Sequence, residues 1–275
     1  MRSKNLDTDS LLREAMRSAA APDAELVRGL KNKLYKAESE LSKIKVRHYF
    51  SAAALVAAII IFTTTSAFAA WYFLKPSEVA NQLNDPALSS AFEGDNALNI
   101  NASVTSGEYT FTLLGVASGK NITDLPFYSD GELKSDRTYA VLAIKKADGA
   151  PIDKQSEEYL NTSFFVSPLI KGTNPALVNI ITMNGAYSEI VKDGTIYRII
   201  ECDNVEMFAD RGLYLAVCTG GPFYNHDAFA WNEQTGDIKA NPGFAGASAV
   251  FDLPVDKNLA DPLKAEQYLK ELLSK

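Results

Sequence analysis

The chain has 275 residues, is 47% hydrophobic and carries a formal net charge of −7 at pH 7. Its larger, C-terminal part is the acidic one, which argues against nucleic acid as a partner, because phosphate backbones are bound by basic surfaces. The two cysteines are too few to complete a structural zinc site without further ligands, and we expect neither a metal nor another cofactor.

Residues 1–49 predict a helical tail with an uncovered apolar stripe. Thr8-Asp9-Ser10 supplies capping residues for a first helix, and Pro22 marks the start of a second. A tail this short cannot build a core of its own. A twin helix in a homodimer, a cytoplasmic protein or the membrane surface must therefore cover the stripe. The second helix carries it at spacings of three and four residues, as Val27, Leu30, Leu34, Ala37, Leu41 and Ile44.

Residues 50–74 predict a single transmembrane helix. The 24 residues from Phe50 to Phe73 hold no charged side chain, and as a helix they extend about 36 Å, enough to cross a ~30 Å hydrocarbon core. Residues 1–48 carry 11 basic and 7 acidic side chains, whereas residues 75–275 carry 16 and 27. The positive-inside rule then places the N-terminus in the cytoplasm. We expect a single-pass protein of the cell membrane, in contact with the lipid bilayer, whose C-terminal domain is extracytoplasmic.

Two other interpretations compete with a retained span. A buried core helix rarely runs so long without a charge. A cleaved signal peptide is the stronger competitor, because Ala67-Phe68-Ala69 has the form of a cleavage site, although the 49 residues before the segment are too many for its n-region. Within the span, Ala53 and Ala57 have the spacing of small residues in helix dimers, which leaves a homodimer through the tail and span open.

Residues 75–95 predict two short helices, SEVANQL after Pro76 and PALSSAFE after Asp85, which we expect to form a stalk or lid. Residues 96–255 predict an antiparallel all-β, sandwich-like domain, because short runs of alternating apolar and polar residues are separated by turn pairs such as Asn184-Gly185. Residues 256–275 predict a closing helix. Its expected apolar face is Leu263, Leu269, Leu272 and Leu273. The expected strands are 98–104, 109–113, 139–144, 163–170, 177–182, 186–191, 196–202, 213–218, 228–231 and 249–253.

Several phrases of the chain resemble one group of bacterial proteins. These phrases are LLREAM, PDAELVRGLKNKL, TSAFAA, PSEVANQLNDPALSSAFEGDNALNIN, YTFTLLGVASGK, DNVEMFADRGLYLAV and FDLPVD. The group consists of anti-sigma-factor-like single-pass membrane proteins of Gram-positive gut bacteria, which carry an exported β domain of unknown function. The resemblance implies that the tail binds a cytoplasmic sigma factor and that the outer domain modulates its release. The tail has no cysteine and only His48, so it lacks the zinc-binding pattern of one anti-sigma family.

Cys202 and Cys218 each stand eight residues from Asp210, around which the sequence predicts a hairpin. Directly opposed cysteines outside the membrane favour a cross-strand disulfide, and two separate buried thiols are the alternative.

Residues that carry catalytic chemistry are sparse. His226, beside Asp227 in a glycine- and aromatic-rich loop, fits either a ligand or base role or a plain loop histidine. No serine-hydrolase, zinc-protease, P-loop or dinucleotide spacing occurs, so we expect no catalytic site and no enzyme. An aromatic concentration around the last strands fits either a core or a ligand platform. It consists of Phe208, Tyr214, Phe223, Tyr224, Phe229 and Trp231.

Overall fold

The computed structural model describes residues 73–129 and 131–274. The predicted tail and the predicted span, apart from its last two residues, lie outside this part of the chain, and both stay predictions. The same holds for the apolar stripe of the tail. Among the described residues, no helix has the length and apolar character that a bilayer crossing requires.

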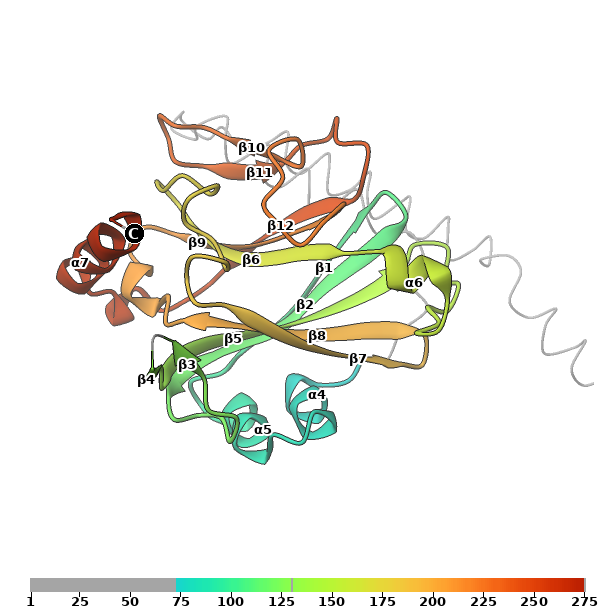
Figure 1. The fold of residues 1–275 in the computed structure, drawn as a ribbon, viewed down its shortest axis with the longest axis horizontal. Helices are drawn as coiled ribbons and strands as arrows, with labels where there is room; N and C mark the ends of the chain where they lie inside the picture. The colour runs from blue at the N-terminus through green and yellow to red at the C-terminus, as the bar shows by residue number, and fades with distance from the viewer. Residues whose placement is uncertain (1–72, 130, 275) are drawn as a thin grey trace, which may run out of the picture. The chain divides into compact units, whose positions relative to one another are not determined.

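The described part is mostly β, as predicted, and its two main sheets lie face to face (Figure 1). Every strand pair is antiparallel. The five-stranded sheet has the order β1 (Leu98–Ser106), β2 (Tyr109–Lys120), β5 (Asp136–Lys146), β8 (Thr195–Asp203) and β7 (Ala186–Lys192). The three-stranded sheet has the order β12 (Ser248–Leu253), β9 (Leu213–Thr219) and β6 (Phe164–Ile170). Two short ribbons are β3 (Tyr128–Ser129) with β4 (Glu132–Leu133), and β10 (Phe229–Trp231) with β11 (Ile238–Ala240).

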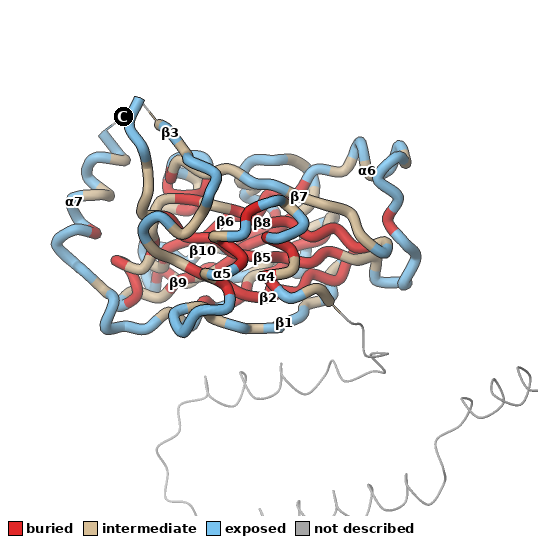
Figure 2. The backbone as a smooth tube through the Cα atoms, turned by 90° about the horizontal axis from the view of Figure 1, so that it is seen from below, coloured by how far each residue is buried: buried red, intermediate tan, exposed pale blue. Residues whose placement is uncertain are grey.

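The main core fills the space between these two sheets. Phe111 of β2 and Leu142 of β5 share it with Phe165 of β6 and Leu215 of β9, and all four are at most 1% exposed. Side chains alternate between the faces of a strand, so the neighbours of these residues on β2 and β5 point to the opposite face. Figure 2 shows buried backbone concentrated along β2, β5, β8 and β9, with exposed segments at both ends.

A second core covers the outer face of the five-stranded sheet, where α4 (Pro76–Gln82) and α5 (Pro86–Glu93) lie (Figure 1). Both helices are present as predicted, but the stalk interpretation is wrong. Val79 and Ala80 of α4 are fully buried, and Leu88 and Phe92 of α5 are 3% exposed. Because both faces of the sheet are covered, β5 is buried almost without interruption and does not alternate as a half-exposed strand would.

Asp85 fixes the start of α5 to a distant loop. Its carboxylate accepts hydrogen bonds from the Leu88 amide at 3.0 Å, from the Asp124 amide at 3.0 Å and from the Thr123 hydroxyl. Asp124 reciprocates by accepting from the Ala87 amide at 3.0 Å. The N-cap predicted at Asp85 therefore also holds the helix pair to the β domain.

One expected strand is wrong. Residues 177–182 form turns and bends. The side-chain amide of Asn179 donates to the carbonyls of Pro175 and Ala176, and the Thr182 hydroxyl donates to the carbonyl of Leu177. These local bonds satisfy backbone groups that a strand would have paired with a neighbour. The ribbons β3–β4 and the strand β11 were not predicted, since two or three residues are too few to show a period.

The closing helix α7 (Pro262–Leu273) begins at Asp261 as expected, but it presents a different face to the core. Leu263 is 83% exposed and Leu273 is 57% exposed. The residues that contact the core are Ala265, Tyr268, Leu269 and Leu272. Tyr268 accounts for the rotation, because its ring packs against Phe208 at 6.0 Å and its hydroxyl donates to Asp203 at 2.9 Å.

Candidate functional site

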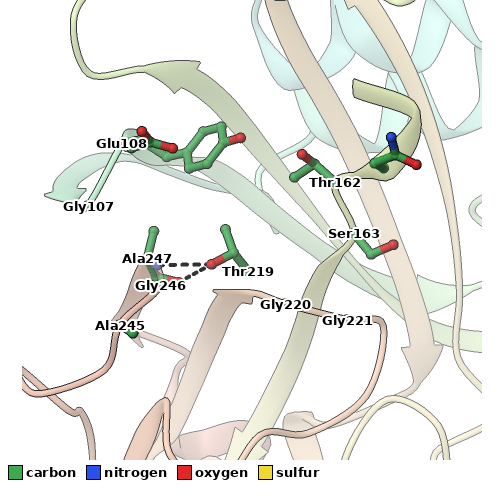
Figure 3. A pocket seen from close by; sticks show the side chains of 12 residues that line it. Gly107, Glu108, Thr162, Ser163, Thr219, Gly220, Gly221, Ala245, Gly246 and Ala247 are labelled. Carbon is green, nitrogen blue, oxygen red and sulfur yellow. Dashed lines mark hydrogen bonds between the residues drawn. The ribbon is translucent and has the colours of Figure 1, made fainter. Parts of the chain in front are cut away.

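A cavity of about 670 Å³ opens at one end of the two-sheet body, and Figure 3 shows it at close range. Four segments that are distant in the sequence meet around it. They are the β1–β2 turn (107–109), the link from α6 (Glu157–Asn161) to β6 (161–163), the end of β9 (219–221) and the approach to β12 (245–247).

Backbone pairing around Thr219 fixes one wall of the cavity. The Thr219 hydroxyl accepts from the Ala247 amide at 2.9 Å (Figure 3), and the Thr219 amide donates to the Ala247 carbonyl at 2.9 Å. A side chain at Gly246 would displace its neighbours, because a Cβ would lie 2.5 Å from the Thr219 hydroxyl oxygen and 2.6 Å from the Phe244 ring. The Ser248 amide donates to the Ser106 hydroxyl at 3.0 Å, which joins this wall to the β1–β2 turn.

The cavity offers polar groups that are mostly neutral. No Lys, Arg or His side chain is among its lining residues, and Glu108 supplies the one carboxylate. Within the described chain, the side chains of Asn161 and Ser163 make no hydrogen bond. Thr162 points across the space toward the β1–β2 turn in Figure 3. Its hydroxyl donates to the Glu158 carbonyl at 2.7 Å and keeps its lone pairs available as acceptors.

Arg198 of β8 anchors the cavity wall that residues 161–163 form. Its side chain is 6% exposed, and one guanidinium nitrogen donates to the Phe164 carbonyl at 2.8 Å. The same guanidinium contacts the Glu189 carboxylate at 2.6 and 2.8 Å, and that carboxylate accepts from the Tyr159 hydroxyl of α6. Because Tyr159 and Phe164 lie on either side of residues 161–163, one buried cation anchors both ends of this wall.

The residue before Arg198 contacts the first residues of the described chain. Tyr197 points to the opposite face of β8, where its hydroxyl accepts from the Leu74 amide at 3.2 Å. Phe73 lies against the same sheet, with its ring centroid 5.1 Å from the Lys145 ammonium nitrogen. Lys145 of β5 pairs with Thr110 of β2, and Thr110 directly follows Tyr109, which lines the cavity. The cavity and the N-terminal end of the described chain therefore lie at the same end of the five-stranded sheet.

A second polar cluster lies at the opposite end and is built around Arg137 of β5. This side chain is 1% exposed and contacts Asp203 at 3.1 Å and Glu201 at 3.3 Å. It also donates to the Asn184 carbonyl at 2.8 Å. Asp203 accepts further bonds from the side-chain amide of Asn184 at 2.7 Å and the Tyr268 hydroxyl at 2.9 Å. Burial, with the nearby Asp203 carboxylate, raises the pKa of Tyr268 above its usual value. Since these groups bind one another, the cluster has a structural role and joins α7 to the sheet.

The prediction of a hairpin around Asp210 is wrong. The reason for expecting a disulfide is lost with it. Cys202 is on β8 of the five-stranded sheet and Cys218 is on β9 of the three-stranded sheet, so the two are not cross-strand partners. The short helix η1 (Glu206–Phe208) lies in the connection between these strands. Both cysteines are free and buried, which is the alternative that the sequence left open.

We expect both thiols to resist alkylation in the folded chain at pH 8. Burial raises the pKa of Cys218 to about 12 and raises that of Cys202 as well, so neither is a thiolate at that pH. After unfolding in urea without a reductant, iodoacetamide should modify both, as mass spectrometry can measure. The raised pKa values also predict that the unfolding free energy falls as the pH rises from about 8.5, where unfolded cysteine ionises, toward 12. An unfolded, unreduced chain that takes up no label would instead establish the disulfide.

The other singled-out residues do not come together as a site. His226 lies edge-on to Tyr224 at 5.0 Å, and the described residues contain no cluster of three or more His, Cys, Asp or Glu that could hold a metal. Of the aromatic concentration, Phe208 and Phe229 are core residues, whereas Phe223 is 65% exposed. The turn residues around the cavity were not predicted as a site, because their sequence signal is that of ordinary loops.

Comparisons with protein-family models, with curated proteins and with solved structures found no match. Support for a function therefore comes from the sequence segments that resemble the anti-sigma-factor-like group and from the contacts of the described residues.

Proposed function

We propose that this chain is a single-pass, anti-sigma-factor-like membrane regulator. In this proposal, residues 50–73 cross the membrane, the β domain lies outside the cell and binds a signal in the cavity, and the tail binds a sigma factor in the cytoplasm. The sequence resemblance supports the sigma-factor role, and the contacts of the first described residues with the β domain support coupling between that domain and the predicted span. Phe73, the last residue of that segment, already packs beside Lys145, and the Leu74 amide is bonded to Tyr197.

A short chain of contacts supports transmission from the cavity to the span. A ligand that orders residues 161–163 favours one position of Phe164 and Tyr159, and both are bonded into the Arg198 network. Tyr197 is covalently next to Arg198 and bonded to Leu74. A ligand shifts a two-state equilibrium only through its different affinity for the two states, and this network offers a means of coupling such a difference to the span.

The topology is tested by reporter fusions at two positions. Alkaline phosphatase, which folds only outside the cytoplasm, should be active when fused after Lys275 and inactive when fused after Arg47, because the basic residues before the span stay inside. A cytoplasmic reporter at the same two positions should give the reverse pattern. An inactive phosphatase after Lys275 together with an active cytoplasmic reporter there would refute the orientation.

A further inference from the structure

We propose that the cavity is a carbohydrate site, and that its ligand is a neutral, hydroxyl-rich glycan. The inference rests on the proposed function in one respect, namely that the cavity faces the cell exterior, where glycans are abundant. The lining residues alone determine which ligand chemistry fits.

The size of the cavity suits a ligand of a few sugar rings. Small-molecule sites usually enclose about 300–1,000 Å³, and this one has about 670 Å³. Its walls are chain segments at strand ends, and they are rich in glycine, which brings backbone N–H and C=O groups close to the open space. Gly220 and Gly221, both at positive φ, have no atom within 4 Å of the position where a Cβ would stand. A ligand can therefore approach the backbone closely there.

The side chains of the cavity match the groups of a sugar. Asn161 and Ser163 provide an amide and a hydroxyl without a partner in the described chain, and Glu108 provides an exposed carboxylate that accepts from sugar hydroxyls. Tyr109 also lines the cavity, and 8% of this residue's surface is accessible. Its ring packs against Phe164 at a centroid distance of 5.2 Å, so only a small part of the residue can contact the C–H groups of a sugar.

Other ligand classes fit the lining less well. An anion would meet Glu108 and find no basic side chain among the lining residues. An apolar ligand would need several large apolar side chains, and Tyr109 is the one such residue in this lining. A hard cation such as Ca²⁺ takes six to eight oxygen ligands, often from several carboxylates, and a lone carboxylate does not supply them.

Saturation-transfer NMR on the full chain in lipid nanodiscs tests the proposal, with cellotetraose, maltotetraose and chitotetraose as probes at about millimolar concentration. We expect at least one of them to bind. Thr162→Trp, which places a large ring in the open space, should weaken that binding at least tenfold. Asn161→Ala, a milder change at an exposed position, should weaken it several-fold. Gln234→Trp is the matched control, because it adds the same ring to the exposed β10–β11 turn at the other end of the molecule, and it should leave binding unchanged.

No binding of any of the three oligosaccharides would overturn the proposal, and so would binding that Thr162→Trp and Asn161→Ala both leave unchanged. Thermal unfolding of each variant identifies loss of the fold, and Asn161→Ala decides the outcome where Thr162→Trp does not fold. Sigma-factor capture by the tail does not depend on these probes. If no glycan binds but the tail still captures a sigma factor, only the ligand class is rejected. If a glycan binds but the tail captures no sigma factor, only the regulatory function is rejected.

Discussion

Arg137→Ala is expected to lower the unfolding free energy of the β domain by about 3 kcal/mol, the lower end of the range for a broken buried ion pair. The substitution leaves the carboxylates of Asp203 and Glu201 without their cation. The lower end applies because the side chains of Asp203 and Glu201 keep 13% and 23% of their surface exposed, so water relieves part of the penalty. Asp203 also accepts from Tyr268, so we expect α7 to loosen first. Urea unfolding of the full chain, followed by tryptophan fluorescence, measures the loss.

Two matched variants separate the buried geometry from charge alone. Arg137→Lys keeps the positive charge but cannot contact Asp203 and Glu201 through two nitrogens in a fixed plane, so it should recover only part of the stability. Lys171→Ala removes an exposed cation paired with Asp237 at 2.6 Å, where both side chains are 38% exposed, and it should change stability by less than about 1 kcal/mol. Equal, small losses for Arg137→Ala and Lys171→Ala would show that the Arg137 cluster does not hold the fold together.

The helix starts and one hairpin were predicted correctly from local sequence signals. The helix starts at Pro76, Asp85 and Asp261 followed from capping and proline preferences, and each is present. The β1–β2 hairpin followed from period-two runs around Ser106-Gly107, and both strands pair there. The strand expected at residues 177–182 is absent, because a second local signal was overlooked. An apolar run predicts a strand only if nearby side chains do not bind the backbone first, as those of Asn179 and Thr182 do.

Features that depend on which elements become neighbours could not be predicted. The sequence does not show that the chain crosses from one sheet to the other between Cys202 and Cys218, so a hairpin was the simplest expectation. The cavity could not be predicted either, because it exists only where four separate turns meet. Tyr268 likewise reveals its role only once Asp203 is known to lie under α7.

The second large effect concerns the tail. Leu30→Asp combined with Leu34→Asp is expected to abolish capture of a sigma factor by the chain and to raise transcription of its target genes. An amphipathic helix docks in a hydrophobic groove through anchors three, four and seven residues apart, and both leucines lie in the predicted stripe. Covering one leucine is worth about 1.5–3 kcal/mol. A tenfold change in affinity corresponds to about 1.4 kcal/mol, so losing two such contacts lowers affinity by two or more factors of ten.

Ser39→Asp combined with Ser42→Asp is the matched control, because it adds the same two charges away from the stripe on the same predicted helix. This variant should capture the sigma factor and repress transcription as the unchanged chain does. A stripe that instead lies on lipid headgroups predicts that the leucine variant loses vesicle binding while transcription stays the same.

The most direct measurement of the regulatory claim is a pull-down from bacterial lysate with residues 1–48 as bait, paired with transcription of the captured factor's target genes in cells. We predict that the tail captures a sigma factor, that the leucine variant captures none, and that target transcription rises only with that variant. A tail that captures no sigma factor, together with unchanged transcription in the leucine variant, would contradict the regulatory function. It would favour the alternative, a membrane-anchored extracytoplasmic binding or envelope-structure module with no sigma-factor role.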